Sequence, residues 1–175
     1  MDERRPDDFS EIIDRHSRQL FSLLYRLTGD YHAAQDLAQD VWLAAYRDYG
    51  NFQGRSEVFT WLYRIAVNRF KRYHRSRRLR GWLGLDQVPE GAASVEMPEG
   101  LESDQRSRAV ARAVAGLPPD FRAAVTLFYF DERDCRKIAE ILGCSEGTVK
   151  SRLWRGRRML AKKLMGFALE TGVTQ

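Results

Sequence analysis

Basic and aromatic side chains gather in two segments of this sequence. The first segment, residues 51–80, joins a Gly-containing loop to several aromatic residues and a strongly basic stretch. The second segment, residues 135–160, is rich in Lys and Arg and contains Trp154. Because cations neutralise phosphates and aromatic rings stack on bases, both segments indicate binding to nucleic acid.

No residue pattern nominates a catalytic group. The zinc-protease, nucleophile-elbow, dinucleotide-binding and P-loop motifs are all missing from the sequence, and its three histidines lie far apart. Cys135 and Cys144 are nine residues apart without a neighbouring pair, so we expect neither a disulfide framework nor a zinc site. The sequence therefore predicts no catalytic residue, no metal ligand and no cofactor.

The second basic segment has the spacing of a helix-turn-helix. Ala139 is small where two helices would cross, Gly143 follows four residues later in the turn, and Val149 follows ten residues after Ala139 on the inner side of the second helix. The start of that second helix offers hydroxyl groups to a phosphate, and its outer face suits the major groove of DNA. The predicted duplex-binding residues are Ser145, Thr148, Lys150, Ser151, Trp154, Arg155 and Arg158.

Trp154 leaves an alternative open, because a helical tryptophan often packs in a core. The first basic segment also leaves two interpretations open, base binding or core packing. An extruded base needs a ring to stack on and an amide or hydroxyl group for its polar edge, which Phe52, Gly54, Ser56 and Asn68 together supply. The aromatic residues that follow this loop can instead belong to the core; they are Phe59, Trp61 and Tyr63.

The segment around Trp42 is a third feature, with carboxylates and an amide beside a large aromatic ring. Asp36 and Asp40 are four residues apart on a predicted helix. This spacing suggests half of a metal site, but a partner-binding face or a solvated surface is the better interpretation because further ligands are missing.

Helical periodicity covers most of the chain, and no segment alternates with a period of two. We expect Ser56, Asp134 and Ser145 to cap helices, and Gly29 to end one. The predicted fold is all-α. The expected helices cover residues 9–27, 32–49, 56–80, 109–115, 119–128, 134–142 and 145–164.

Charge is divided unevenly along the 175 residues, which carry a net charge of +5. Residues 64–80 hold eight basic and no acidic side chains, whereas residues 81–104 hold six acidic and no basic ones. The acidic stretch has no helical period, so we interpret residues 86–104 as a flexible linker, with an ordered surface loop as the alternative. This predicts two small helical domains, residues 1–85 and 105–175, the second containing the helix-turn-helix.

Without a membrane span or a secretory signal, the chain is expected in the cytoplasm.

These motifs together resemble the bacterial sigma-70 family of RNA polymerase sigma factors, in its small extracytoplasmic-function (ECF) type. The resemblance covers residues 9–80 and 109–165. The matching stretches are DLAQDVWLAAYR, the loop and helix from Phe52 to Asn68 with the basic run behind them, LPPDFRAAVTL and KIAEILGCSEGTVKSRLWRGRRML.

The resemblance implies partners and roles. Core RNA polymerase would be bound through its β′ clamp helices and β flap, with Asp36, Gln39, Asp40 and Leu43 on the clamp. The single-stranded −10 element would be captured by a loop and helix in the first domain, and the duplex −35 element by the recognition helix. An anti-sigma factor is also implied, and direct membrane insertion is not. The −10 residues would be Phe52, Gly54, Ser56, Trp61, Arg64, Asn68, Lys71 and Arg72.

The sequence departs from the family at several places. Asp134-Cys135-Arg136-Lys137 stands where relatives often carry acidic residues, and Arg72 stands near a position that is often acidic. Promoter preference is therefore not carried over. A stand-alone helix-turn-helix regulator is the main alternative, but it leaves the basic first domain unexplained. A nucleic-acid enzyme such as a nuclease is the second alternative. It would need a cluster of carboxylates around a metal ion, which the sequence does not show.

Overall fold

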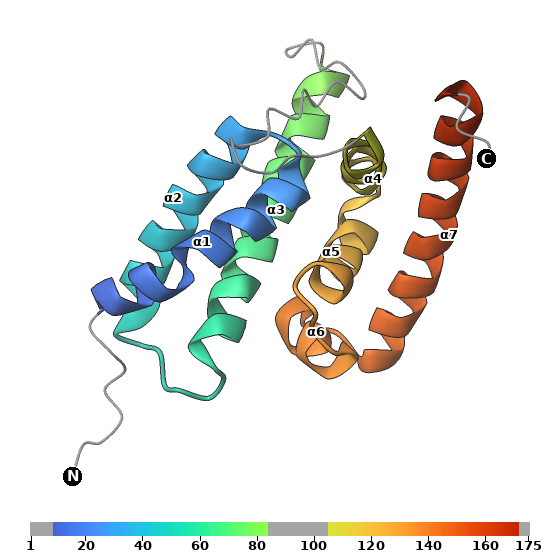
Figure 1. Ribbon diagram of the computed structural model, residues 1–175. Helices are drawn as coiled ribbons and strands as arrows, with labels where there is room; N and C mark the ends of the chain where they lie inside the picture. The colour runs from blue at the N-terminus through green and yellow to red at the C-terminus, as the bar shows by residue number, and fades with distance from the viewer. Residues whose placement is uncertain (1–8, 84–104, 172–175) are drawn as a thin grey trace.

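The computed structural model describes residues 9–83 and 105–171, and these residues form seven helices and no strand (Figure 1). This confirms the all-α prediction. The predicted linker, residues 86–104, lies outside the described residues. The helices are α1 (Phe9–Thr28), α2 (Tyr31–Tyr49), α3 (Val58–Trp82), α4 (Gln105–Ala115), α5 (Pro119–Tyr129), α6 (Cys135–Leu142) and α7 (Glu146–Thr171).

Helices α1, α2 and α3 form an N-terminal group held by apolar side chains at helical spacing. Leu20, Leu24 and Leu27 of α1 are fully buried. Gly29 takes a positive φ of 69° after α1, as expected for a glycine that ends a helix. The carboxylate of Asp30 then caps α2 by accepting a hydrogen bond from the Ala33 N–H at 2.9 Å.

The predicted cap of α3 is wrong. Glu57, not Ser56, occupies the N-cap position, and its side chain makes no capping hydrogen bond. The reason is register: the Trp61 N–H donates to the Glu57 carbonyl, so the first turn closes one residue after Ser56. The helix ends at Trp82, two residues beyond the expected end at Arg80.

Helices α4 to α7 form a C-terminal group whose local signals are confirmed. The Asp134 carboxylate accepts from the Lys137 N–H at 2.8 Å, and the Ser145 hydroxyl accepts from the Thr148 N–H at 3.1 Å. Gly143 adopts a left-handed φ of 62° between α6 and α7. These residues build the helix-turn-helix that the sequence predicts. The two outer helices are longer than expected, since α4 begins at Gln105 and α7 reaches Thr171.

The two helical groups share one buried apolar cluster, which runs from α1, α2 and α3 into α4, α5, α6 and α7. Figure 1 shows α4, α5 and α6 beside α1 and α3, with α7 on the outer side. Arg122 of α5 crosses this contact and is almost fully buried. It donates to the Leu27 carbonyl at 2.6 Å and, through its other nitrogens, to the Leu117 carbonyl at 3.1 and 2.8 Å.

Candidate nucleic-acid interfaces

The outer face of α7 presents its basic residues to solvent. Val149 and Leu153 point inward, with exposed fractions of 0% and 3%, and so fix the orientation of the helix. The side chains expected at the major groove are all exposed: Lys150, Ser151, Trp154, Arg155 and Arg158. The structure therefore gathers them on one face, as the sequence predicts.

Trp154 does not pack in the core, which decides the alternative that the sequence left open. Its side chain is 54% exposed, and the Arg158 guanidinium lies 4.7 Å from the ring centroid. A cation stacked on an indole holds both groups in place on the surface. The pair offers a flat aromatic edge and a positive charge to the same partner.

Ser145 and Thr148 lie at the start of α7 and have a structural role as well. The two hydroxyl groups lie 2.9 Å apart and share a hydrogen bond, while Ser145 also caps the helix. Both residues sit where the free N–H groups of a helix favour an anion.

The loop before α3 contains three of the four predicted base-binding residues, Phe52, Gly54 and Ser56, and the fourth lies on α3 itself. Phe52 packs against Trp61 in a tilted arrangement, with ring centroids 4.8 Å apart and an angle of 36° between the planes. Gly54 is exposed and has a φ of +64°, a conformation that other residues adopt only with strain. Ser56 is half-buried. Asn68 is exposed and lies ten residues after Val58, the first residue of α3.

Of the three aromatic residues that follow the loop, Tyr63 belongs to the buried core, and Phe59 and Trp61 are partly buried against it. Tyr63 is 2% exposed, and the Phe59 ring lies 3.8 Å from its ring. Burial raises the pKa of Tyr63. The Arg133 guanidinium covers the Phe59 ring at 4.1 Å. Trp61 contacts the loop through Phe52.

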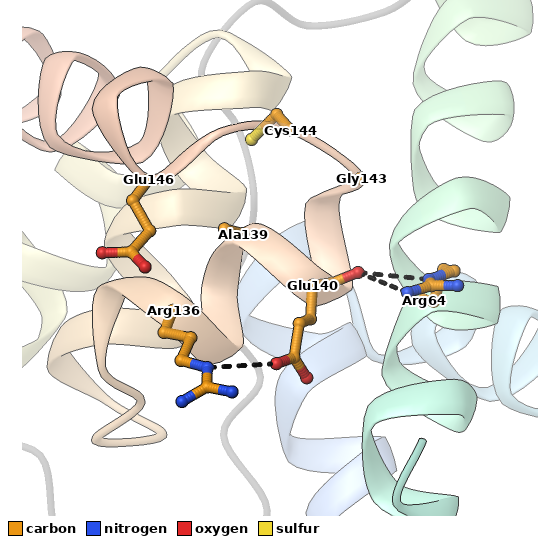
Figure 2. Close-up of a pocket in the computed structure, with 7 residues that line it drawn as sticks. All are labelled: Arg64, Arg136, Ala139, Glu140, Gly143, Cys144 and Glu146. Atoms are coloured by element: carbon orange, nitrogen blue, oxygen red, sulfur yellow. Dashed lines mark hydrogen bonds and ion pairs between the residues drawn. The ribbon is translucent and has the colours of Figure 1, made fainter. Parts of the chain in front are cut away.

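Two predicted −10 residues are engaged by the C-terminal group. Arg64 donates from Nε and Nη2 to the Glu140 carbonyl at 3.2 and 2.6 Å, as Figure 2 shows. Lys71 pairs with Asp120 of α5 at 2.7 Å. The hydrogen bond from Lys71 lowers the pKa of Asp120. Asn68 and Arg72 of the same helix are exposed.

The pocket in Figure 2 lies at this contact between α3 and the helix-turn-helix. Arg136 pairs there with the Glu140 carboxylate at 3.7 Å. The carboxylate and the backbone carbonyl of Glu140 are thus each bound by an arginine, Arg136 and Arg64. Nearby, Lys137 pairs with Glu57 at 3.0 Å. The basic stretch that departs from the family pattern at residues 135–137 thus contributes to the contact with the N-terminal group.

Two family models match the chain, one for each helical group. Residues 12–80 match "Sigma-70 region 2", and residues 107–160 match "Sigma-70, region 4". The ECF RNA polymerase sigma factor SigW of Bacillus subtilis is 34% identical over 167 residues, which are 90% of this chain and 89% of SigW. The chain belongs to the ECF sigma factors of the sigma-70 family. The ECF RNA polymerase sigma-E factor of Escherichia coli is also 34% identical, over 89% of this chain and 86% of that protein.

Two solved structures share the arrangement of the helices. The sigma factor RpoE, in complex with the anti-sigma factor NepR from Bartonella quintana, matches with a TM-score of 0.75 and 26% identity, over 90% of this chain and 97% of that chain. The structure of CnrH in complex with the cytosolic domain of CnrY matches in fold, with a TM-score of 0.64 and 21% identity, over 90% of this chain and 88% of that chain.

The third predicted surface of this sigma factor lies on α2. Its polar residues and Leu43, which is 56% exposed, all face solvent: Asp36, Gln39, Asp40 and Leu43. Tyr46 follows on the same side and is 67% exposed. Sequence reasoning missed Tyr46, although its position three residues after Leu43 was a usable signal.

No helix within the described ranges is long and apolar enough to cross a membrane.

Proposed function

We propose that this sigma factor binds core RNA polymerase through the exposed face of α2, recognises the −35 and −10 elements of a specialised set of promoters, and promotes melting of the −10 region. Exposed carboxylates and an amide beside exposed Leu43 and Tyr46 give α2 a mixed polar and apolar surface, which is typical of a protein interface. The chain itself makes no covalent change, and the polymerase supplies the catalysis in the cytoplasm.

The observation that supports this proposal is the presence on one chain of two different faces whose residues suit DNA. The outer face of α7 is exposed and basic, which suits the major groove of duplex DNA. The loop before α3 and the helix itself supply tilted aromatic rings and the exposed amide of Asn68, the group types that a flipped base requires. A stand-alone operator-binding regulator would need only the first of these.

Promoter binding requires a change in the contact between the helical groups. Arg64 and Lys71 are expected to contact DNA, yet Glu140 and Asp120 engage them in the structure. DNA and the C-terminal group therefore compete for the same cations. Since the relative RpoE is bound by an anti-sigma factor, we also propose a protein of that class as a partner that controls this chain.

The role of α7 is tested by replacing Lys150 and Arg155 with Ala. We expect the double variant to bind core polymerase normally but to lose initiation at its promoter by more than about tenfold, because each lost cation removes roughly 1–3 kcal/mol of DNA binding. Run-off transcription measures initiation, and co-purification with core polymerase measures assembly.

The matched control removes two exposed charges elsewhere, Arg18→Ala with Arg112→Ala, and should transcribe normally. Loss of core binding by the Lys150 and Arg155 variant would contradict the separation of roles.

A further inference from the structure

The loop between α5 and α6 lies in the contact between the two helical groups. Its residues on both sides of Asp131 touch the N-terminal group. The Arg26 guanidinium of α1 lies 4.6 Å from the ring centroid of Phe130. The Arg133 guanidinium lies 4.1 Å from the ring centroid of Phe59 on α3. Asp131, between these two contacts in the chain, therefore faces the N-terminal group.

The shape of this loop is set by the C-terminal group. The Asp131 N–H donates to the Thr126 carbonyl of α5 at 3.2 Å, and the Arg133 N–H donates to the Leu127 carbonyl at 2.9 Å. Glu132 between them has a φ of 52°, which is uncommon for a residue other than glycine. Because the loop is bonded to α5, the surroundings of Asp131 change when the two groups separate.

The charged and titratable groups that face the Asp131 carboxyl group are Arg26 from α1, Tyr63 from α3 and Arg133 from its own loop. Within the described part of the chain, three buried atoms here have no hydrogen-bond partner: Asp131 Oδ2, Arg26 Nε and Arg133 Nε. A buried carboxylate with an unsatisfied oxygen is costly, and its protonated form costs less. Burial accordingly raises the pKa of Asp131 to about 6, although Arg26 and Arg133 oppose the shift.

We propose that this loop is a proton-dependent latch, in which protonated Asp131 keeps the two helical groups together and loss of the proton favours their separation. The contact is most stable below the ordinary pKa of 3.8 and weakens as the pH rises through about 6. Separation exposes Asp131 to water and releases Arg64 and Lys71 from the C-terminal group. Their role at promoter DNA rests on the proposed function, whereas the latch itself does not.

Two histidines near the contact give the opposite pH dependence. The ring centroid of His16 on α1 lies 6.1 Å from that of Phe59, and His74 on α3 is subject to the charge of Arg122. Burial is the main cause that lowers the pKa of both histidines. Acid therefore weakens the packed structure through them, because protonation creates a charge that burial disfavours. A contact that strengthens on acidification thus has Asp131 as its source.

The test counts closed and open chains by single-molecule Förster transfer in the free, full-length protein. A donor dye replaces the exposed side chain of Arg18 in α1, and an acceptor replaces that of Lys162 in α7. We expect the ratio of closed to open chains to fall about tenfold between about pH 5 and about pH 7.5. Asp131→Asn has no proton to lose, so it should keep the high ratio throughout this range.

The matched control is Asp14→Asn, which removes an exposed carboxylate from α1 and should respond to pH like wild type. A wild-type ratio that stays constant or rises with pH would overturn the latch, as would equal pH dependence of Asp131→Asn and wild type. If circular dichroism shows that Asp131→Asn does not fold, the wild-type titration still decides. Failure of the chain to direct transcription with core polymerase would instead refute the proposed function and leave this result unchanged.

Discussion

At the residue scale, two charged side chains lie in the contact between the helical groups. Burial lowers the pKa of Arg122 to about 10, and hydrogen bonds to two carbonyls with a ring contact to Phe70 at 5.4 Å compensate for its lost hydration. Burial raises the pKa of Asp131 from 3.8 to about 6, against the opposing effect of Arg26 and Arg133. Its Oδ2 atom has no hydrogen-bond partner among the described residues.

Asp131 should make stability depend on pH. Its folded pKa of about 6 exceeds the ordinary value of 3.8, so protonation favours the folded state. This contribution is fully present below the ordinary value and is lost as the pH rises through the folded value. We expect Asp131→Asn to remove the dependence, so that wild type loses stability relative to the variant as the pH rises from 3.8 to about 6. Urea denaturation across this range measures the difference, and a constant difference would contradict the assignment.

The sequence predicts the exposure of some side chains but not the burial of others. The exposed positions of Lys150, Ser151 and Arg155 follow from helical spacing alone, and the structure confirms them. The burial of Arg122 does not follow, because its partner Leu27 lies 95 residues away and a charged side chain is expected at the surface.

At the scale of elements, helix ends depend on local chemistry and most of them were predictable. Asp134, Gly143 and Ser145 act within three or four residues, so their types and spacing are enough. Ser56 failed because Glu57 lies at the actual cap without a side-chain bond. Helix α7 continues beyond the expected end at Leu164 to Thr171, although Gly166, a residue type that often ends helices, lies between them.

Gly156 sets how closely α7 approaches α5. A Cβ atom at this position would lie 2.8 Å from Val125 Cγ2, and Val125 is fully buried. We expect Gly156→Ala to lower the free energy of unfolding by about 1 kcal/mol, since overpacking costs roughly 1–3 kcal/mol and the helix propensity of Ala returns up to about 1 kcal/mol. Thermal or urea denaturation measures the change.

Gly166→Ala is the matched control in the same helix, because nothing lies within 4 Å of its added Cβ. It should leave stability unchanged or raise it slightly. If Gly156→Ala were as stable as Gly166→Ala, the close approach of α5 and α7 at Gly156 would be disproved.

At the scale of the whole molecule, one apolar cluster joins the two groups, and ion pairs surround it. Periodicity predicts which face of each helix is apolar but not which faces meet, so this contact could not be derived from the sequence. It matters for function because it engages Arg64 and Lys71. The boundaries of the two domains and the linker between them stay predictions.

The central claim is that the chain gives core RNA polymerase its promoter specificity. Run-off transcription over a promoter library, with chain and core polymerase together and each alone, tests it most directly. We predict specific transcripts only from the combination, from templates that share two separated sequence elements. Binding of a duplex operator by the chain alone, unaffected by core polymerase and without specific transcripts, would contradict the claim.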